Sequence, residues 1–218
     1  MAKSPQVLRI KSKEQFDWLI DHLVLETNRA WDHWDLWGGL DKALAEYATE
    51  INQTPQFWRL TIRAHQDSVI LRLGRLFDPH PIALSLANLL QTIHHGVNAS
   101  TLSNLGIKIQ QLDLTLLQKD LETLSESDPF VSRLMDIRNE YLAHRASRLV
   151  LGKSLPTFQR EDIEALLNRA SSMLEKYGAA CGRPYVSRHY AGEDDYKHLL
   201  ELLRLGLDAI KRTKADYR

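Results

Sequence analysis

Residues 128–148 read DPFVSRLMDIRNEYLAHRASR, and this stretch decides the fold class and directs the search for a functional site. Asp128 followed by Pro129 is typical of a helix N-terminus, because the carboxylate accepts hydrogen bonds from free backbone amides and proline suits the first helical position. At about 100° per residue, the apolar side chains of this stretch fill an arc of roughly 160° on one helix face. Those side chains belong to Phe130, Val131, Leu134, Met135, Ile137, Tyr141 and Leu142. The stretch therefore predicts an amphipathic helix from 129 to about 144.

The same three- and four-residue spacing of apolar residues recurs along almost the whole chain, and no alternating strand pattern interrupts it. This periodicity predicts an all-α fold, a helical bundle. Helices are expected from Ser12 to the Gly38–Gly39 pair and then over 40–52, 55–78, 85–95, 114–124, 129–144, 161–177 and 194–212. Loops are expected over 146–155 and 178–192. With no repeat and no composition shift to mark a boundary, we expect one domain over residues 1–218.

Composition excludes several classes of protein. The 218 residues contain 28 Lys and Arg against 28 Asp and Glu, so the chain has no general basic coat for nucleic acid. The single cysteine, Cys181, is typical of a reducing compartment and leaves no cysteine-based zinc site. The N-terminus lacks the apolar segment of a secretory signal, and no apolar run approaches the length of a bilayer span. We expect a cytoplasmic protein without membrane contact.

Arg138 lies near the middle of the apolar arc of the 129–144 helix. A guanidinium there is costly unless something pairs or hydrates it. Three explanations are open: an ion pair with a buried carboxylate, a place in a subunit interface, or a cleft that binds an anion such as phosphate. His144 follows six residues later, about 120° away on an ideal helix. The two side chains converge only if the last turn is distorted, or if a second copy meets the first across a two-fold axis.

Local charge favours the anion-binding explanation. The stretch from 133 to 160 contains six basic residues and two acidic ones, which gives it a local balance of about +4 by simple counting. The basic residues are Arg133, Arg138, Arg145, Arg148, Lys153 and Arg160. The preceding stretch, 113–128, is acidic. A neutral chain is therefore divided into acidic and basic segments.

Residues 138–144, RNEYLAH, resemble the motif of HEPN domains, in which an arginine is followed by four to six residues and a histidine. The longer string RNEYLAHR is similar to the AbiU branch, which is named for phage abortive infection. Residues 68–78, SVILRLGRLFD, also resemble the central helix of that branch, which ends in Leu, an aromatic residue and Asp. The resemblance implies a HEPN-type bundle with a core at about 57–174 and extra N- and C-terminal helices.

The resemblance also implies a metal-independent ribonuclease that needs no cofactor and acts as a homodimer, with both motif copies facing one cleft. His144 would be the general base toward a ribose 2′-hydroxyl or the acid toward the leaving 5′-oxygen. Arg138 would stabilise the charge that develops on the phosphorane, and Asn139 would orient the histidine or bind the phosphate. Arg145, Arg148 and Lys153 are the expected RNA contacts. At Ala146 the chain departs from the branch, which often has Asp there.

A toxin or defence role implies RNA as substrate and an antitoxin or defence-system partner. The alternative is a HEPN-like adaptor module that binds a nucleotide or a protein without catalysis. A third possibility, without a functional site, is that Arg138 forms only a buried structural ion pair.

Three other groups of side chains are candidate sites. Trp31, Trp34 and Trp37 recur at three-residue steps, which is typical of core or interface packing, with stacking on RNA bases as the alternative. A metal site with nitrogen and oxygen ligands is a weak candidate at His189 and His198, which have Glu193, Asp194 and Asp195 between them. The basic C-terminal segment that contains Lys211 is expected to be a solvated helix end, with an RNA contact as the alternative.

Overall fold

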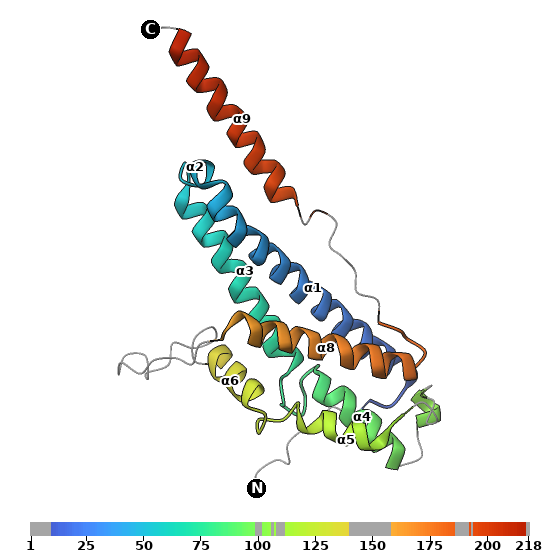
Figure 1. Ribbon diagram of the computed structural model, residues 1–218. Helices are drawn as coiled ribbons and strands as arrows, with labels where there is room; N and C mark the ends of the chain where they lie inside the picture. The colour runs from blue at the N-terminus through green and yellow to red at the C-terminus, as the bar shows by residue number, and fades with distance from the viewer. Residues whose placement is uncertain are drawn as a thin grey trace, which may run out of the picture. The chain divides into compact units, whose positions relative to one another are not determined.

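The computed structural model describes residues 10–98, 102–105, 107, 112–139, 158–185, 192 and 194–216. The helices over these residues are α1 (Lys13–Glu46), α2 (Ala48–Ile51), α3 (Pro55–Leu76), α4 (Leu86–Asn98), η1 (Leu102–Leu105), α5 (Leu114–Glu122), α6 (Pro129–Ile137), α8 (Arg160–Ala180) and α9 (Asp195–Asp216) (Figure 1). This part of the chain contains no strand. The all-α prediction is confirmed.

Helix N-termini follow the capping residues in the sequence. The Ser12 hydroxyl accepts a hydrogen bond from the Gln15 backbone amide at 3.3 Å, and α1 begins at the next residue. Asp113 accepts one from the Leu116 amide at 3.0 Å at the start of α5. Each oxygen satisfies an amide that has no partner within its helix, which fixes the residue at which the helix begins.

The prediction that the Gly38–Gly39 pair ends the first helix is wrong. α1 runs on to Glu46, so the second predicted helix is the end of α1 followed by the short α2. A Cβ at Gly39 would overlap the phenol ring of Tyr196, so the glycine makes room for a packed neighbour. A glycine costs a helix only about 1 kcal/mol, and the packing around α1 outweighs that.

Contacts divide the chain into two compact units, Met1–Ala30 with Ile70–Ser187 and Trp31–Val69 with Arg188–Arg218. In the first unit, α4 and α5 lie side by side (Figure 1). Its buried side chains come from α1, α3, α4, η1, α5, α6 and α8, and the largest fully buried one is Tyr177 of α8. The Tyr177 hydroxyl donates to Asp120 of α5 at 2.8 Å, which gives the buried phenol a partner. Burial and Asp120 raise the pKa of this tyrosine.

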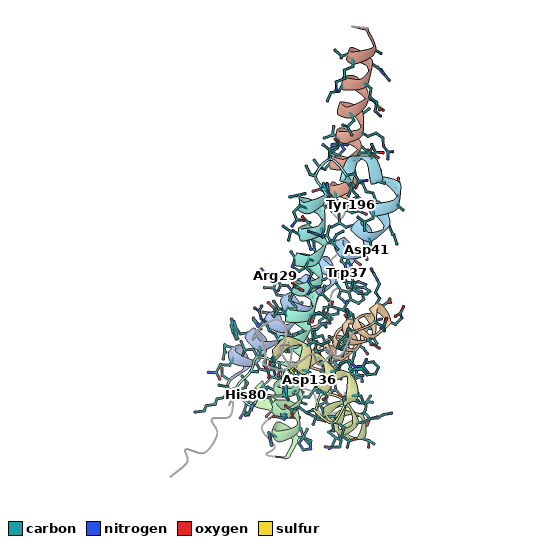
Figure 2. All side chains as sticks on the ribbon, turned by 90° about the vertical axis from the view of Figure 1, so that its left-hand side faces the viewer. Arg29, Trp37, Asp41, His80, Asp136 and Tyr196 are labelled. Carbon is teal, nitrogen blue, oxygen red and sulfur yellow. The ribbon has the colours of Figure 1, made fainter. Side chains whose placement is uncertain are left out.

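The second unit has its own core, formed by α1 after residue 30, α2, the first part of α3, and α9. The buried residues of this cluster are Leu40, Ala43, Tyr47, Ile51, Trp58 and Leu200. Trp34 and Trp37 of α1 are almost fully buried and pack edge to face, with ring centroids 5.2 Å apart. Figure 2 labels Trp37, Asp41 and Tyr196 in this unit. Trp34 and Trp37 therefore pack inside the protein, which agrees with the core interpretation, while Trp31 is half-buried.

Among the described helices, none is both long enough and apolar enough to cross a membrane.

Candidate functional site

The helix that carries Arg138 begins as the sequence predicts. Asp128 accepts hydrogen bonds from the Phe130 and Val131 amides at 2.9 and 3.1 Å, and Pro129 is the first residue of α6. The apolar face is buried through Val131, Leu134 and Met135. At residues 138 and 139 the backbone changes to a wider π-type turn. Single π-turns of this kind often occur at functional sites.

The Arg138 guanidinium has a carboxylate partner, Asp78, two residues after the end of α3. Its Nη1 donates to Oδ2 of Asp78 at 2.7 Å and to the backbone oxygen of Gly74 at 2.9 Å. Its Nε donates to Oδ1 of Asn139 at 3.0 Å. The side chains of Arg138 and Asp78 are 21% and 22% exposed, so the pair is accessible to solvent from one side. Arg138 is therefore paired within the chain without being sealed in the core.

Gly74 provides the space for this arrangement. A Cβ at this position would lie 2.5 Å from Cδ and 3.1 Å from Cγ of Arg138. No side chain fits between α3 and the arginine stem, so the glycine allows Arg138 to reach the α3 backbone. A glycine inside the predicted 55–78 helix was the signal for this close approach, and the sequence interpretation missed it.

Asp78 is itself held in place. Its second carboxylate oxygen, Oδ1, accepts a hydrogen bond from the His80 backbone amide at 2.9 Å. Figure 2 labels His80, two residues after Asp78, and Asp136, two residues before Arg138. The sequence interpretation quoted Asp78 as part of a motif but assigned it no partner. In the structure Asp78 orients Arg138, because its Oδ2 accepts a hydrogen bond from the guanidinium.

A second arginine cluster lies on the same turns of α3. Glu26 of α1 is buried, and both of its carboxylate oxygens accept from Nη1 of Arg72, at 3.1 and 3.0 Å. Arg75, next to Gly74, lies 3.7 Å from the same carboxylate and remains 61% exposed. One carboxylate thus faces two guanidiniums. Arg75 adds an exposed positive charge to the helix that holds Arg138.

Two of the predicted site residues are described and four are not. Arg138 and Asn139 are hydrogen-bonded to each other, and the Asn139 side chain is exposed. His144, Arg145, Arg148 and Lys153 lie outside the described residues. The predicted loop over 146–155 also lies there, as do His189 and Glu193 of the predicted metal set, whereas His198 is in α9.

A pair of histidines in the second unit was not anticipated. Nδ1 of His33 on α1 lies 2.8 Å from Nδ1 of His65 on α3, a hydrogen bond that requires at least one neutral ring. Burial lowers the pKa of His65. Among the described residues there is no cluster of three or more His, Cys, Asp or Glu that would hold a metal ion.

Comparison with known families agrees with the motif. The sequence model of the AbiU2 family, a HEPN family, matches residues 13–199. The match extends beyond the 57–174 core that the motifs predict and includes all of α1, α3, α6 and α8. No curated protein and no solved structure matches the chain. Because the family match covers most of the chain and contains the arginine motif, the chain belongs to the AbiU2 family of HEPN domains.

Proposed function

We propose that this protein is a metal-independent endoribonuclease in which Arg138 stabilises the reacting phosphate and His144 transfers the proton. The observation that supports it most directly is the one-sided anchoring of Arg138. Asp78 and Gly74 hold Nη1, while no described residue accepts a hydrogen bond from Nη2. A guanidinium carries five N–H donors, so an arginine oriented through Nη1 and Nε can present Nη2 to a phosphate oxygen.

The chemistry follows from these groups. The ribose 2′-oxygen attacks the adjacent phosphorus, its proton passes to a base, and the 5′-oxygen leaves after it receives a proton. His144 serves as that base or as the acid toward the 5′-oxygen, because its ordinary pKa lies near neutrality. Arg138 stabilises the negative charge that develops on the non-bridging oxygens of the phosphorane. A guanidinium that is already oriented by Asp78 pays no reorganisation cost at the moment of reaction.

A homodimer is the assembly in which this site is complete. Arg138 and His144 diverge by about 120° on an ideal helix, so a second copy across a two-fold axis supplies one way of bringing them to the same phosphate. Arg145, Arg148 and Lys153 are the proposed RNA contacts, together with Arg75.

The biological setting that we propose is a toxin or defence role, with an antitoxin or another defence component as partner. The second candidate is an adaptor that binds RNA or a nucleotide without cleavage. It is favoured by the same observation, since an anchored Arg138 binds phosphate whether or not His144 is positioned to react.

A cleavage assay on single-stranded RNA in excess EDTA separates these functions. Wild type is expected to cleave, and Arg138→Ala and His144→Ala are expected to lose at least about a hundredfold in rate. Arg59→Ala, an exposed arginine at the other end of α3, is the matched control and is expected to cleave like wild type. RNA binding without cleavage would support the adaptor. Cleavage that EDTA abolishes would contradict the proposed mechanism.

A further inference from the structure

α9 has an apolar face that its own unit does not cover. One side of the helix packs on the second core through Leu200, with Tyr196 and Leu203 beside it. A different side carries large apolar residues that remain exposed. These are Leu199 at 46%, Leu202 at 52%, Leu205 at 66% and Ile210 at 54%. Figure 1 shows α9 continuing beyond α2.

The exposed residues form one continuous surface. At about 100° per residue, positions 199, 202, 205, 206, 209, 210 and 213 fill an arc of roughly 140°. Their side chains are Leu, Leu, Leu, Gly, Ala, Ile and Thr, with no charge among them. A Cβ added at Gly206 would meet nothing within 4 Å, so the centre of the surface is open. Contiguous apolar surface of this kind usually marks an interaction site.

The charges beside this surface are of opposite sign at its two ends. Lys197 pairs with Asp194, Lys211 with Asp208, and Arg204 with Glu50 of α2. Glu201 and Arg212 form no ion pair with any described residue, and both are exposed. They lie within about 20° of each other on the helix wheel, so both border the same edge of the apolar surface. Glu201 lies near the N-terminal end of the surface and Arg212 near its C-terminal end.

We propose that α9 is a self-association surface, on which a second copy of the chain packs its own α9 in antiparallel orientation with the two-fold axis at Gly206. In this register Leu202 faces Ile210 of the partner subunit, and Leu199 faces Thr213 of the partner subunit. Gly206 meets its own symmetry mate, where the missing side chain allows the two backbones to approach closely. Glu201 comes within one residue of Arg212 of the partner subunit, and the symmetry repeats that pair.

The charge pattern favours a second copy over other occupants. A surface with an acidic residue at one end and a basic residue at the other is complementary to itself when it is reversed. RNA would contact Arg212 but would be repelled at Glu201, and a uniformly charged protein would match only one end. The family match ends at residue 199, so nearly all of this surface lies beyond it. The proposal is independent of RNA cleavage.

Charge reversal tests the register. Sedimentation velocity of the full chain is expected to show concentration-dependent self-association that Glu201→Arg or Arg212→Glu weakens at least tenfold. An equimolar mixture of the two single variants is expected to regain it, because every pair across the interface again joins opposite charges. The double variant is expected to regain it for the same reason. Glu164→Arg, on the exposed face of α8, is the matched control and should change nothing.

Cross-linking distinguishes this contact from dimerisation elsewhere on the chain. Gly206→Cys is expected to form a disulfide-linked dimer under mild oxidation, because the position lies on the two-fold axis. Ala215→Cys, on the opposite side of α9, is expected to stay unlinked. Equal linking of both variants, or of neither, would overturn the proposal. Self-association in sedimentation velocity that is the same for wild type and for both single charge-reversal variants would overturn it as well.

Discussion

Gly74 and Arg138 compete for one space. A Cβ at Gly74 would lie 2.5 Å from Cδ of Arg138, and it is the absence of that carbon that lets the guanidinium donate to the Gly74 carbonyl oxygen at 2.9 Å. The position of the cation therefore depends on a missing methyl group in a neighbouring helix. The proposed ribonuclease site is built on this contact and on the Asp78 ion pair.

Gly74→Ala is expected to displace Arg138 and to lower the rate of RNA cleavage by roughly a hundredfold, since small misplacements of an oriented group have effects of that size. The added methyl costs about 1–3 kcal/mol of stability through overpacking, and the helix propensity of alanine returns up to about 1 kcal/mol. Initial cleavage rates and urea unfolding measure the two effects.

A double-mutant cycle isolates the cause. In an Arg138→Ala background, Cδ is absent and Gly74→Ala is expected to cost nothing or to stabilise slightly. If Gly74→Ala destabilises the chain equally in both backgrounds, the clash with Arg138 is not its cause.

Asp78→Ala is expected to leave Arg138 without its anchor. Both partners keep about a fifth of their side-chain surface exposed, so we expect a loss of about 1–3 kcal/mol, below the 3–5 kcal/mol typical of a broken buried pair. Cleavage is expected to fall further in Asp78→Ala than in Asp78→Asn, whose amide oxygen still accepts a hydrogen bond. Asp67→Ala, a half-buried position on α3, should change the free energy of unfolding by less than about 0.5 kcal/mol. Full activity of Asp78→Ala would remove the orienting role.

Stability is expected to fall as the pH drops below about 6.5 because of His65. Burial lowers the pKa of this side chain in the folded state. Between that lower value and the ordinary pKa of about 6.5, the unfolded chain binds a proton that the folded chain does not, so acidification favours unfolding. The half-buried position limits the effect to less than about 1 kcal/mol per pH unit. Urea unfolding from pH 5.5 to 7.5 should show a shallower slope for His65→Gln than for wild type, and equal slopes would contradict this assignment.

Cys181 is expected to be unreactive in the folded protein. Its side chain is buried at the end of α8, and burial raises the pKa of the thiol to about 12. Because the thiolate is the reactive form, a disulfide reagent at pH 8 should label the native chain far more slowly than the chain in urea. Rapid labelling of the native protein would show that this end of α8 opens readily.

Helix type and most helix starts were predictable from local rules. Asp113 and Asp128 act within three residues of the amides they cap, so their effect is readable from the sequence. The end of α1 was not, because the penalty of Gly38 and Gly39 is small and is outweighed by contacts with residues such as Tyr196, which are distant in the chain.

The candidate site was predictable only in part, for the same reason. The anomaly of Arg138 on an apolar face was visible in the sequence, and a carboxylate partner was among the open explanations. Its identity was not visible, since Asp78 lies 60 residues earlier in the chain, just after the end of α3. The His33–His65 contact joins residues 32 apart and left no local pattern to detect.

The measurement that tests the central claim most directly is the chemistry of the RNA ends produced in excess EDTA, read by mass spectrometry for wild type, Arg138→Ala and His144→Ala. Attack by the 2′-oxygen requires a 2′,3′-cyclic phosphate on one fragment and a 5′-hydroxyl on the other. The account predicts these ends from wild type and uncleaved RNA from both variants. Fragments with a 3′-hydroxyl and a 5′-phosphate, or cleavage that both variants retain, would contradict it.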